Sequence, residues 1–168
     1  MILIGYDGSV DARTAIDHAG SLCPGATVTV LTVWEPFATV LARTPAGLGP
    51  LAGIGELADI DAEAEQAAKR SAREGAERAE AAGLHATAIV VARRGSIADA
   101  ILDQADRLDA DAIVLGSRGL NGVTSLLLGS VSHRIVQHAD RTVIVTPAPG
   151  VAEQRLRHRR RAEAHATA

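Results

Sequence analysis

The residues best suited to chemistry form one stretch, residues 116–132, which reads Gly-Ser-Arg-Gly-Leu-Asn-Gly-Val-Thr-Ser-Leu-Leu-Leu-Gly-Ser-Val-Ser. A short apolar run at 112–115 precedes it, and a helical pattern with Val131, Ile135 and Ala139 on one face closes it. This order predicts a strand, a glycine-rich loop and a helix N-terminus. The first NH groups of a helix have no partner within the helix, and the helix dipole adds partial positive charge there. The stretch therefore predicts a loop that binds the phosphate of a nucleotide.

Individual residues of the stretch have predicted roles. Gly129 lets backbone come close to a ligand, and Ser130 and Ser132 add hydroxyl groups, although both serines are also suited to capping the helix. Gly116 and Gly119 remove side chains where the strand ends, so that a second part of the ligand can lie against bare backbone.

The glycine spacing is Gly, two residues, Gly, nine residues and Gly-Ser. It resembles the signature G-x2-G-x9-G-[ST] of the universal stress protein family in its nucleotide-binding branch, through Gly116, Gly119, Gly129 and Ser130. A second motif agrees, because residues 2–9 (Ile-Leu-Ile-Gly-Tyr-Asp-Gly-Ser) resemble the first strand and aspartate turn of that family. Three glycines alone are weak evidence, whereas two motifs in the right order are strong. The resemblance covers residues 1–147 and leaves a basic, flexible C-terminal tail at 148–168.

Strand and helix patterns alternate along the chain, which predicts a single α/β domain with an open parallel sheet and helices on both faces. Five strands are expected, at 1–6, 26–34, 85–92, 112–115 and 142–146. The resemblance implies a Rossmann-like fold, similar to adenine nucleotide alpha hydrolases, with strand order 3-2-1-4-5. In that order the first and fourth strands are neighbours, and the Asp7 turn lies beside Gly116.

The resemblance implies that ATP, with Mg²⁺, is the ligand. Asp7 would bind ribose hydroxyls, or a phosphate-bound metal through water, and the alternative is a turn aspartate that bonds its own backbone. Arg118 would neutralise phosphate charge or stack on the base, and a solvated loop arginine is the alternative. Gly5, Val33 and Leu115 would flank the base, or are ordinary strand interior. The implied cofactor-binding residues are Gly5, Asp7, Val33, Leu115, Gly116, Arg118, Gly119, Gly129, Ser130, Val131 and Ser132.

Local patterns predict the connecting elements. Ser9 caps the first helix, and Ser96 with Asp99 forms a capping box at a later one. The second helix spans 56–82, with Glu65–Lys69 and Glu74–Arg78 as pairs on its wet side and a small, mostly apolar face formed by Ile60, Ala64, Ala67, Ser71 and Ala72. Residues 35–55 are rich in proline and glycine, which predicts a mobile connection, with a lid or a partner surface as alternatives.

Composition limits the function further. The net charge of −3 gives no overall reason to expect binding to nucleic acid. No apolar run is long enough to span a membrane, and the first residues do not have the pattern of a signal peptide. The lone Cys23 excludes an internal disulfide and suits a reducing cytoplasm. Five arginines against two glutamates give residues 151–168 a charge of +3, so this tail is either a solvated terminus or a contact for nucleic acid or an acidic partner.

The loop lacks the lysine of a P-loop, no base is placed near a γ-phosphate, and Thr124 stands where related proteins often carry Lys or Arg. No metal-ligand pattern is recognisable among the six histidines, and no catalytic residue is assigned. The expected function is an ATP-binding regulatory module of the stress response that acts on an unidentified protein partner. The alternatives are a slow ATPase or autophosphorylating enzyme and a nucleotide-free dimeric scaffold. Related proteins imply a homodimer through strand 142–146, whose sequence Thr-Val-Ile-Val-Thr has no charged residue.

Overall fold

The centre of the molecule is one sheet of five parallel strands in the order β3-β2-β1-β4-β5. The computed structural model describes residues 1–41, 54–119 and 128–147. The expected α/β class and strand order are confirmed. The strands are β1 (Ile2–Gly5), β2 (Thr27–Trp34), β3 (His85–Ala92), β4 (Ala112–Gly116) and β5 (Thr142–Thr146).

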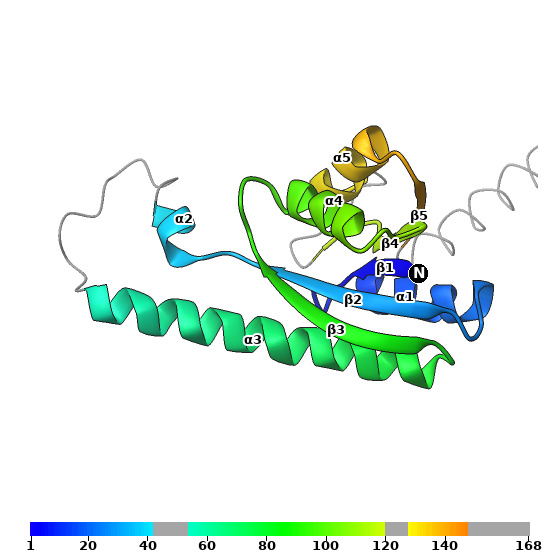
Figure 1. Cartoon of the computed structure of the whole chain (residues 1–168), viewed down its shortest axis with the longest axis horizontal. Coiled ribbons are helices and arrows are strands. Elements are labelled where there is room, and N and C mark those ends of the chain that lie inside the picture. The colour runs from blue at the N-terminus through cyan, green and yellow to red at the C-terminus, as the bar shows by residue number, and fades with distance from the viewer. Residues whose placement is uncertain (42–53, 120–127, 148–168) are drawn as a thin grey trace, which may run out of the picture.

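Helices cover both faces of the sheet, as Figure 1 shows. Helices α1 (Val10–Leu22) and α3 (Ile54–Ala81) lie on one face, and α4 (Ile97–Arg107) and α5 (Ser130–His138) lie on the other. Alternate residues of the central strands supply the two cores: Ile4 and Val114 point to the α1 and α3 face, whereas Leu3 and Ile113 point to the α4 and α5 face. Period-2 alternation in strands buried on both sides explains why these runs contain so few polar residues.

Strands β2 and β3 are longer than their neighbours at the carboxyl end. Gly5, the last residue of β1, lies level with Leu31, and β2 continues to Trp34 in register with Ala92 of β3. The extra residues therefore project beyond the edge at which β1 and β4 end. Ligands of open α/β sheets bind at this edge, at the point where the order of the strands along the chain reverses.

Capping residues fix the starts of α1 and α4 as predicted. The backbone NH of Ala12 donates to Ser9 Oγ at 3.2 Å. At α4, Asp99 N donates to Ser96 Oγ at 3.1 Å and Ser96 N donates back to Asp99 Oδ2 at 3.2 Å, which completes a capping box. Both helices therefore start where local sequence satisfies the unpaired NH groups of their first turns.

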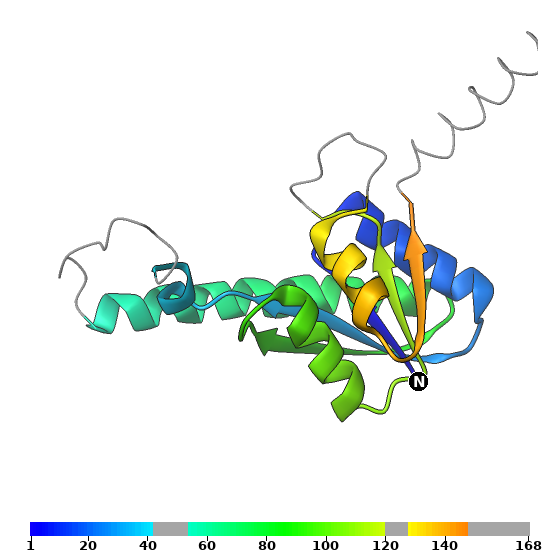
Figure 2. The same ribbon diagram turned by 90° about the horizontal axis from the view of Figure 1, so that it is seen from above.

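The expectation of an irregular connection over 35–55 is wrong in part. A short helix, α2 (Phe37–Leu41), lies there, and residues 42–53 fall outside the described part of the chain. The backbone NH of Phe37 donates to Asp61 Oδ1 at 2.6 Å, which fixes the start of α2 to α3. Figure 2 shows that α2 and the N-terminal part of α3 lie side by side beyond the end of the sheet.

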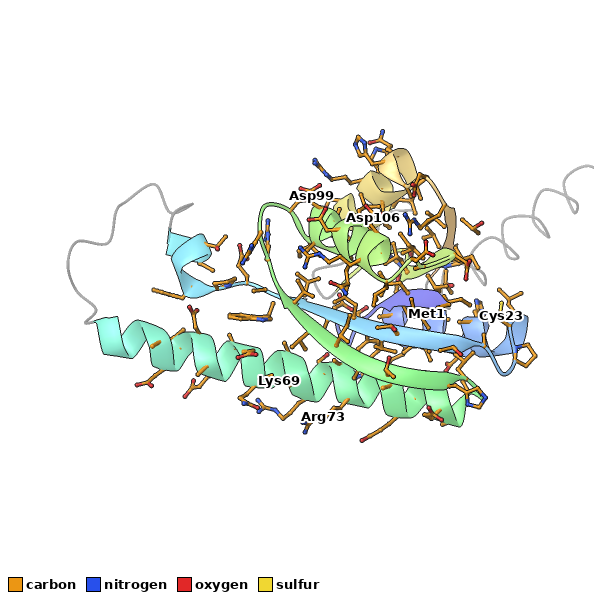
Figure 3. All side chains as sticks on the ribbon, viewed as in Figure 1. Met1, Cys23, Lys69, Arg73, Asp99 and Asp106 are labelled. Atoms are coloured by element: carbon orange, nitrogen blue, oxygen red, sulfur yellow. The ribbon has the colours of Figure 1, made fainter. Side chains whose placement is uncertain are left out.

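The buried face of α3 differs from the predicted one. Ala68, Ala72, Gly75 and Ala79 are buried against the sheet, whereas Ile60 is 42% exposed. The predicted stripe is confirmed at Ala72 and wrong towards Ile60, because the first turns of α3 extend past the sheet and have no core to face. Gly75 allows α3 to approach the sheet closely, since a β-carbon there would lie 2.8 Å from Val30 Cγ1 and 2.9 Å from the Tyr6 ring. Figure 3 shows Lys69 and Arg73 on the opposite, outward side of the helix.

One of the two predicted ion pairs on α3 is confirmed and one is wrong. Lys69 pairs with Glu65 at 2.8 Å. Glu74 instead accepts hydrogen bonds from the Tyr6 hydroxyl at 2.8 Å and from Arg13, while Arg78 pairs with Asp17. Tyr6 and residues of α1 compete with the i,i+4 partner, so these charges join α3 to its neighbours rather than forming a solvated face.

No helix within the described ranges 1–41, 54–119 and 128–147 is long and apolar enough to cross a membrane.

Candidate functional site

The predicted site residues gather at the carboxyl ends of β1 and β4. These two strands are hydrogen-bonded neighbours, with Ile4 level with Val114. The Asp7 turn follows β1, residues 117–119 follow β4, and α5 begins beside them at residue 130. Figure 2 shows the starts of α1 and α5 next to the carboxyl end of β4. Two motifs more than a hundred residues apart in sequence thus meet at one edge of the sheet.

The Asp7 turn is fixed by its own hydrogen bonds. Asp7 Oδ1 accepts from the backbone NH of Ser9 at 3.0 Å, as expected of a turn aspartate. Gly8 has a φ of +78°, which a residue with a side chain adopts only with strain. Ser9 then links the two motifs, because its hydroxyl donates to the carbonyl of Arg118 at 3.5 Å. The local turn and a role in binding are compatible, since Oδ2 of Asp7 points towards the loop at Gly119.

The two glycines at the end of β4 allow two close approaches within the protein. A β-carbon on Gly116 would lie 2.7 Å from Cβ of Asp11 and 2.8 Å from the backbone nitrogen of Ala12. A β-carbon on Gly119 would lie 2.6 Å from Asp7 Oδ2. Gly116 therefore makes room for the first turn of α1, and Gly119 makes room for the carboxylate. Packing inside the protein accounts for both glycines, beside any approach of a ligand.

The carbonyl of Ser117 closes the loop at its base. It accepts from the backbone NH of Gly129 at 2.8 Å and from the Ser132 hydroxyl at 2.9 Å. Ser132 is only 3% exposed, and its hydroxyl also lies 3.0 Å from the carbonyl of Gly129. The hydroxyl predicted to contact phosphate is thus engaged in holding the first turn of α5 against residue 117. A β-carbon on Gly129 would lie 3.2 Å from that same carbonyl, which makes the position tight.

The start of α5 offers backbone NH groups to a ligand. Gly129 is the N-cap, with no side-chain cap hydrogen bond, and the first hydrogen bond of the helix runs from His133 N to the carbonyl of Gly129. The NH groups of Ser130, Val131 and Ser132 therefore have no acceptor within the helix. Ser130 is exposed, whereas the Val131 side chain packs against the core. Such a helix start is suited to holding a phosphate or carboxylate.

The apolar residues predicted to flank a base lie on one face of the sheet. Gly5, Val33 and Leu115 all point to the side covered by α4 and α5. A β-carbon on Gly5 would lie 2.6 Å from Leu115 Cδ2, so a side chain at residue 5 would force Leu115, which is 5% exposed, to shift. Val33 is half-buried on the part of β2 that projects beyond Gly5. Their contact with a base stays a prediction, whereas their packing roles are seen.

Asp11, which sequence reasoning missed, binds residues 117 and 118 at the start of the loop. It is 7% exposed in the first turn of α1. Its Oδ2 accepts from the Ser117 hydroxyl at 2.8 Å and from the backbone NH of Arg118 at 3.0 Å. Arg118 Nε lies 3.6 Å from the same oxygen, so the arginine is paired with α1 rather than being a solvated loop residue. An aspartate in the first turn of a helix is usually explained by its favourable interaction with the helix dipole. In the sequence, only the position of Asp11 just after the Asp7 turn points to a role in the site.

Within the described residues, no group of three or more His, Cys, Asp or Glu side chains could hold a metal ion. Thr124 and the C-terminal tail at 148–168 lie outside the described residues.

Comparison with known proteins shows the family to which the chain belongs. The model of the universal stress protein family matches residues 1–147. The chain belongs to the universal stress protein family. A universal stress protein of Thermus aquaticus, from the QAH/OAS sulfhydrylase 3' region, is 33% identical over 150 residues, which cover 86% of this chain and 96% of that protein. Universal stress protein G of Salmonella typhimurium matches over a shorter segment, 42% identical over 53 residues, or 32% of this chain and 37% of that protein.

Solved structures of universal stress proteins share the fold. That of Archaeoglobus fulgidus in complex with dAMP has a TM-score of 0.52 at 21% identity, covering 86% of this chain and 95% of that one. An Arabidopsis thaliana family protein with AMP bound has a TM-score of 0.58 at 16% identity, covering 87% of this chain and 90% of that one. At these identities the likeness shows the fold alone, and the nucleotides are properties of those two universal stress proteins.

Proposed function

We propose that this chain binds an adenine nucleotide, ATP with Mg²⁺, at the carboxyl ends of β1 and β4, and acts in the cytoplasm as a nucleotide-dependent regulatory module. One observation carries the proposal: the carbonyl of Ser117 binds both Gly129 N and Ser132 Oγ, and so holds the NH groups at the start of α5 beside the Asp7 turn. An anion-binding helix start next to a carboxylate suits a ligand with both phosphate and sugar hydroxyls.

The residues present fit such a ligand. The NH groups of Ser130, Val131 and Ser132 would receive a phosphate, and the exposed Ser130 hydroxyl would add a donor. Asp7, whose Oδ1 is held by Ser9 N, would accept from ribose hydroxyls or hold phosphate-bound Mg²⁺ through water. The Mg²⁺ ion would offset phosphate charge. Related proteins with AMP and dAMP bound support the class of ligand, and ATP is the further step of the proposal.

Binding is favoured over catalysis. The residues from Gly116 to Ser132 include no lysine, and Arg118 is paired with Asp11. With no base assigned, we expect ATP turnover far below about 1 s⁻¹, the low end for ordinary enzymes. A steady-state phosphate-release assay checks this. Robust Mg²⁺-dependent hydrolysis that is lost in Asp7→Ala would contradict it and would favour an enzyme instead.

Identification of nucleotide in the purified protein tests the proposal directly. The protein is purified without added nucleotide and denatured, and the released ligand is identified by chromatography and mass spectrometry. Recovered ATP supports the proposal, whereas ADP or phosphoserine favours slow hydrolysis or autophosphorylation. If no nucleotide is recovered, ATP titration in a calorimeter with Mg²⁺ decides, and the absence of binding there would leave a nucleotide-free scaffold.

The regulatory proposal includes a homodimer through β5. This strand is an edge of the sheet, bonded to β4, and its central residues Val143, Ile144 and Val145 are only half-buried in one chain. An apolar edge strand invites pairing with another strand. A twofold contact between identical edges would limit the assembly to two chains.

A further inference from the structure

The segment that leaves β4 is tied to the first turn of α1 by a single carboxylate oxygen. Oδ2 of Asp11 accepts from the Ser117 hydroxyl at 2.8 Å and from the backbone NH of Arg118 at 3.0 Å. Asp11 is 7% exposed, so these bonds are partly shielded from water. The carboxylate is therefore placed by contacts to both backbone and side chain, at the base of the loop that the proposed nucleotide would contact.

The same oxygen lies 3.6 Å from Nε of Arg118. Arg118 is the only charged residue in the sequence from Gly116 to Ser132. Its positive charge is compensated by Asp11, and Asp7 adds a second carboxylate beside Gly119. The two aspartates and one arginine together carry a formal charge of −1. A phosphate at the start of α5 would meet helix NH groups, but no net positive charge from these three side chains.

We infer that Asp11 is a specificity-determining residue that sets how many phosphates the site accepts in the absence of a divalent cation. This inference rests on the proposed function. ATP carries more phosphate charge than AMP, so a fixed carboxylate near the loop disfavours ATP more strongly than AMP. Mg²⁺ bound to ATP offsets that difference. The charge of Asp11 thus couples ATP affinity to Mg²⁺, while its hydrogen bonds position residues 117 and 118.

The Asp11→Asn variant separates charge from positioning, because the asparagine keeps a side-chain oxygen of the same reach and lacks the negative charge. Calorimetric Kd values are measured for AMP and for ATP, each with and without Mg²⁺. Without Mg²⁺, we expect the ratio of the ATP Kd to the AMP Kd to fall by about fivefold in Asp11→Asn. The gain in ATP affinity on adding Mg²⁺ should shrink by a similar factor. Asp17→Asn is the matched control, because Asp17 lies on the same helix and pairs with Arg78 of α3. It should leave the ratio unchanged.

Each contrary outcome has one meaning. If Asp11→Asn changes the AMP and ATP affinities equally, Asp11 has only a structural role and the inference is wrong, while the proposed function stands. If the wild-type protein binds neither nucleotide, both the proposed function and the inference fall. If Asp11→Asn does not fold, Asp11→Ser is measured instead, since it also lacks the negative charge and should also lower the ratio of the ATP Kd to the AMP Kd. An unchanged ratio in a folded Asp11→Ser variant overturns the inference.

Discussion

The α-carbon of Gly119 faces the carboxylate of Asp7 so closely that a β-carbon there would lie 2.6 Å from Oδ2. Real β-carbons do not approach an oxygen this closely, so either the loop or the carboxylate would have to move. The turn at Asp7 and the loop at Gly119 can therefore pack this closely because residue 119 has no side chain. This contact gives a direct way to ask whether the two motifs act as one site.

We expect Gly119→Ala to weaken nucleotide binding by at least about tenfold, because the methyl group displaces Asp7 or residue 119 from the site. Asp7→Ala removes the carboxylate, and Gly119→Ala in that background should cost little more. A double-mutant cycle of calorimetric affinities measures this coupling. Additive losses would show that Gly119 and Asp7 contribute separately. Circular dichroism of each variant verifies that the fold is retained.

At Gly129, a substitution should act through the Ser117 carbonyl. A β-carbon would lie 3.2 Å from that oxygen, so Gly129→Ala should weaken ATP binding and the branched Gly129→Val should abolish it. The fold should survive, because Gly129 precedes α5 and contributes no side chain to the core. Calorimetry on the folded variants checks both steps. Tight ATP binding retained by Gly129→Val would show that the position is not part of the site.

Strand β5 is the proposed dimer contact, and a charge placed there should separate the two chains. Ile144→Lys puts like charges near each other across the twofold axis and should shift the protein towards monomer, as measured by light scattering at micromolar concentration. Because Ile144 also packs against the core on the α1 face, Val145→Lys is a second variant. Ala88→Lys, an exposed position on the opposite edge strand β3, is the matched control. A monomeric wild type, or a dimer unaffected by both variants, would exclude β5 as the interface.

The contact of α3 with Tyr6 and α1 through Glu74 should make stability depend on pH. The hydrogen bond from Tyr6, followed by those from Arg13, lowers the pKa of Glu74 below its ordinary value. A lowered folded-state pKa stabilises the fold above the unfolded pKa of about 4.3, and this contribution is lost as pH falls through the folded value. Glu74→Gln should therefore destabilise at pH 6, by at most about 1 kcal/mol for such exposed partners, and by less near pH 2.

Urea denaturation at both pH values measures the difference. Glu77→Gln, an exposed glutamate on the same helix, is the control and should change stability little at either pH. An equal loss for Glu74→Gln at both pH values would mean that the charge of Glu74 does not contribute.

The sequence predicted those features that depend on neighbours along the chain. The Ser9 and Ser96 caps were correct because a cap is completed within four residues. Side-chain contacts between distant segments were missed, although the resemblance to a known family supplied the order of the strands. Ile60 looks like a buried residue by its spacing, but the sheet does not reach it. Asp11 is ordinary in sequence, and its role is visible only when the fold brings Ser117 next to it.

The length of α3 relative to the sheet has a consequence for how the helix opens. Its second half is held by buried Ala68, Ala72 and Ala79, whereas its first half lies beyond the sheet beside α2. Amide hydrogens in one continuous helix should therefore exchange with solvent by two routes. Those near Ala72 and Ala79 should exchange only through global unfolding, and those near Ile60 through local fraying at much lower free energy. One continuous helix would then contain two parts that unfold at different free energies, and the boundary between them would lie where the sheet ends.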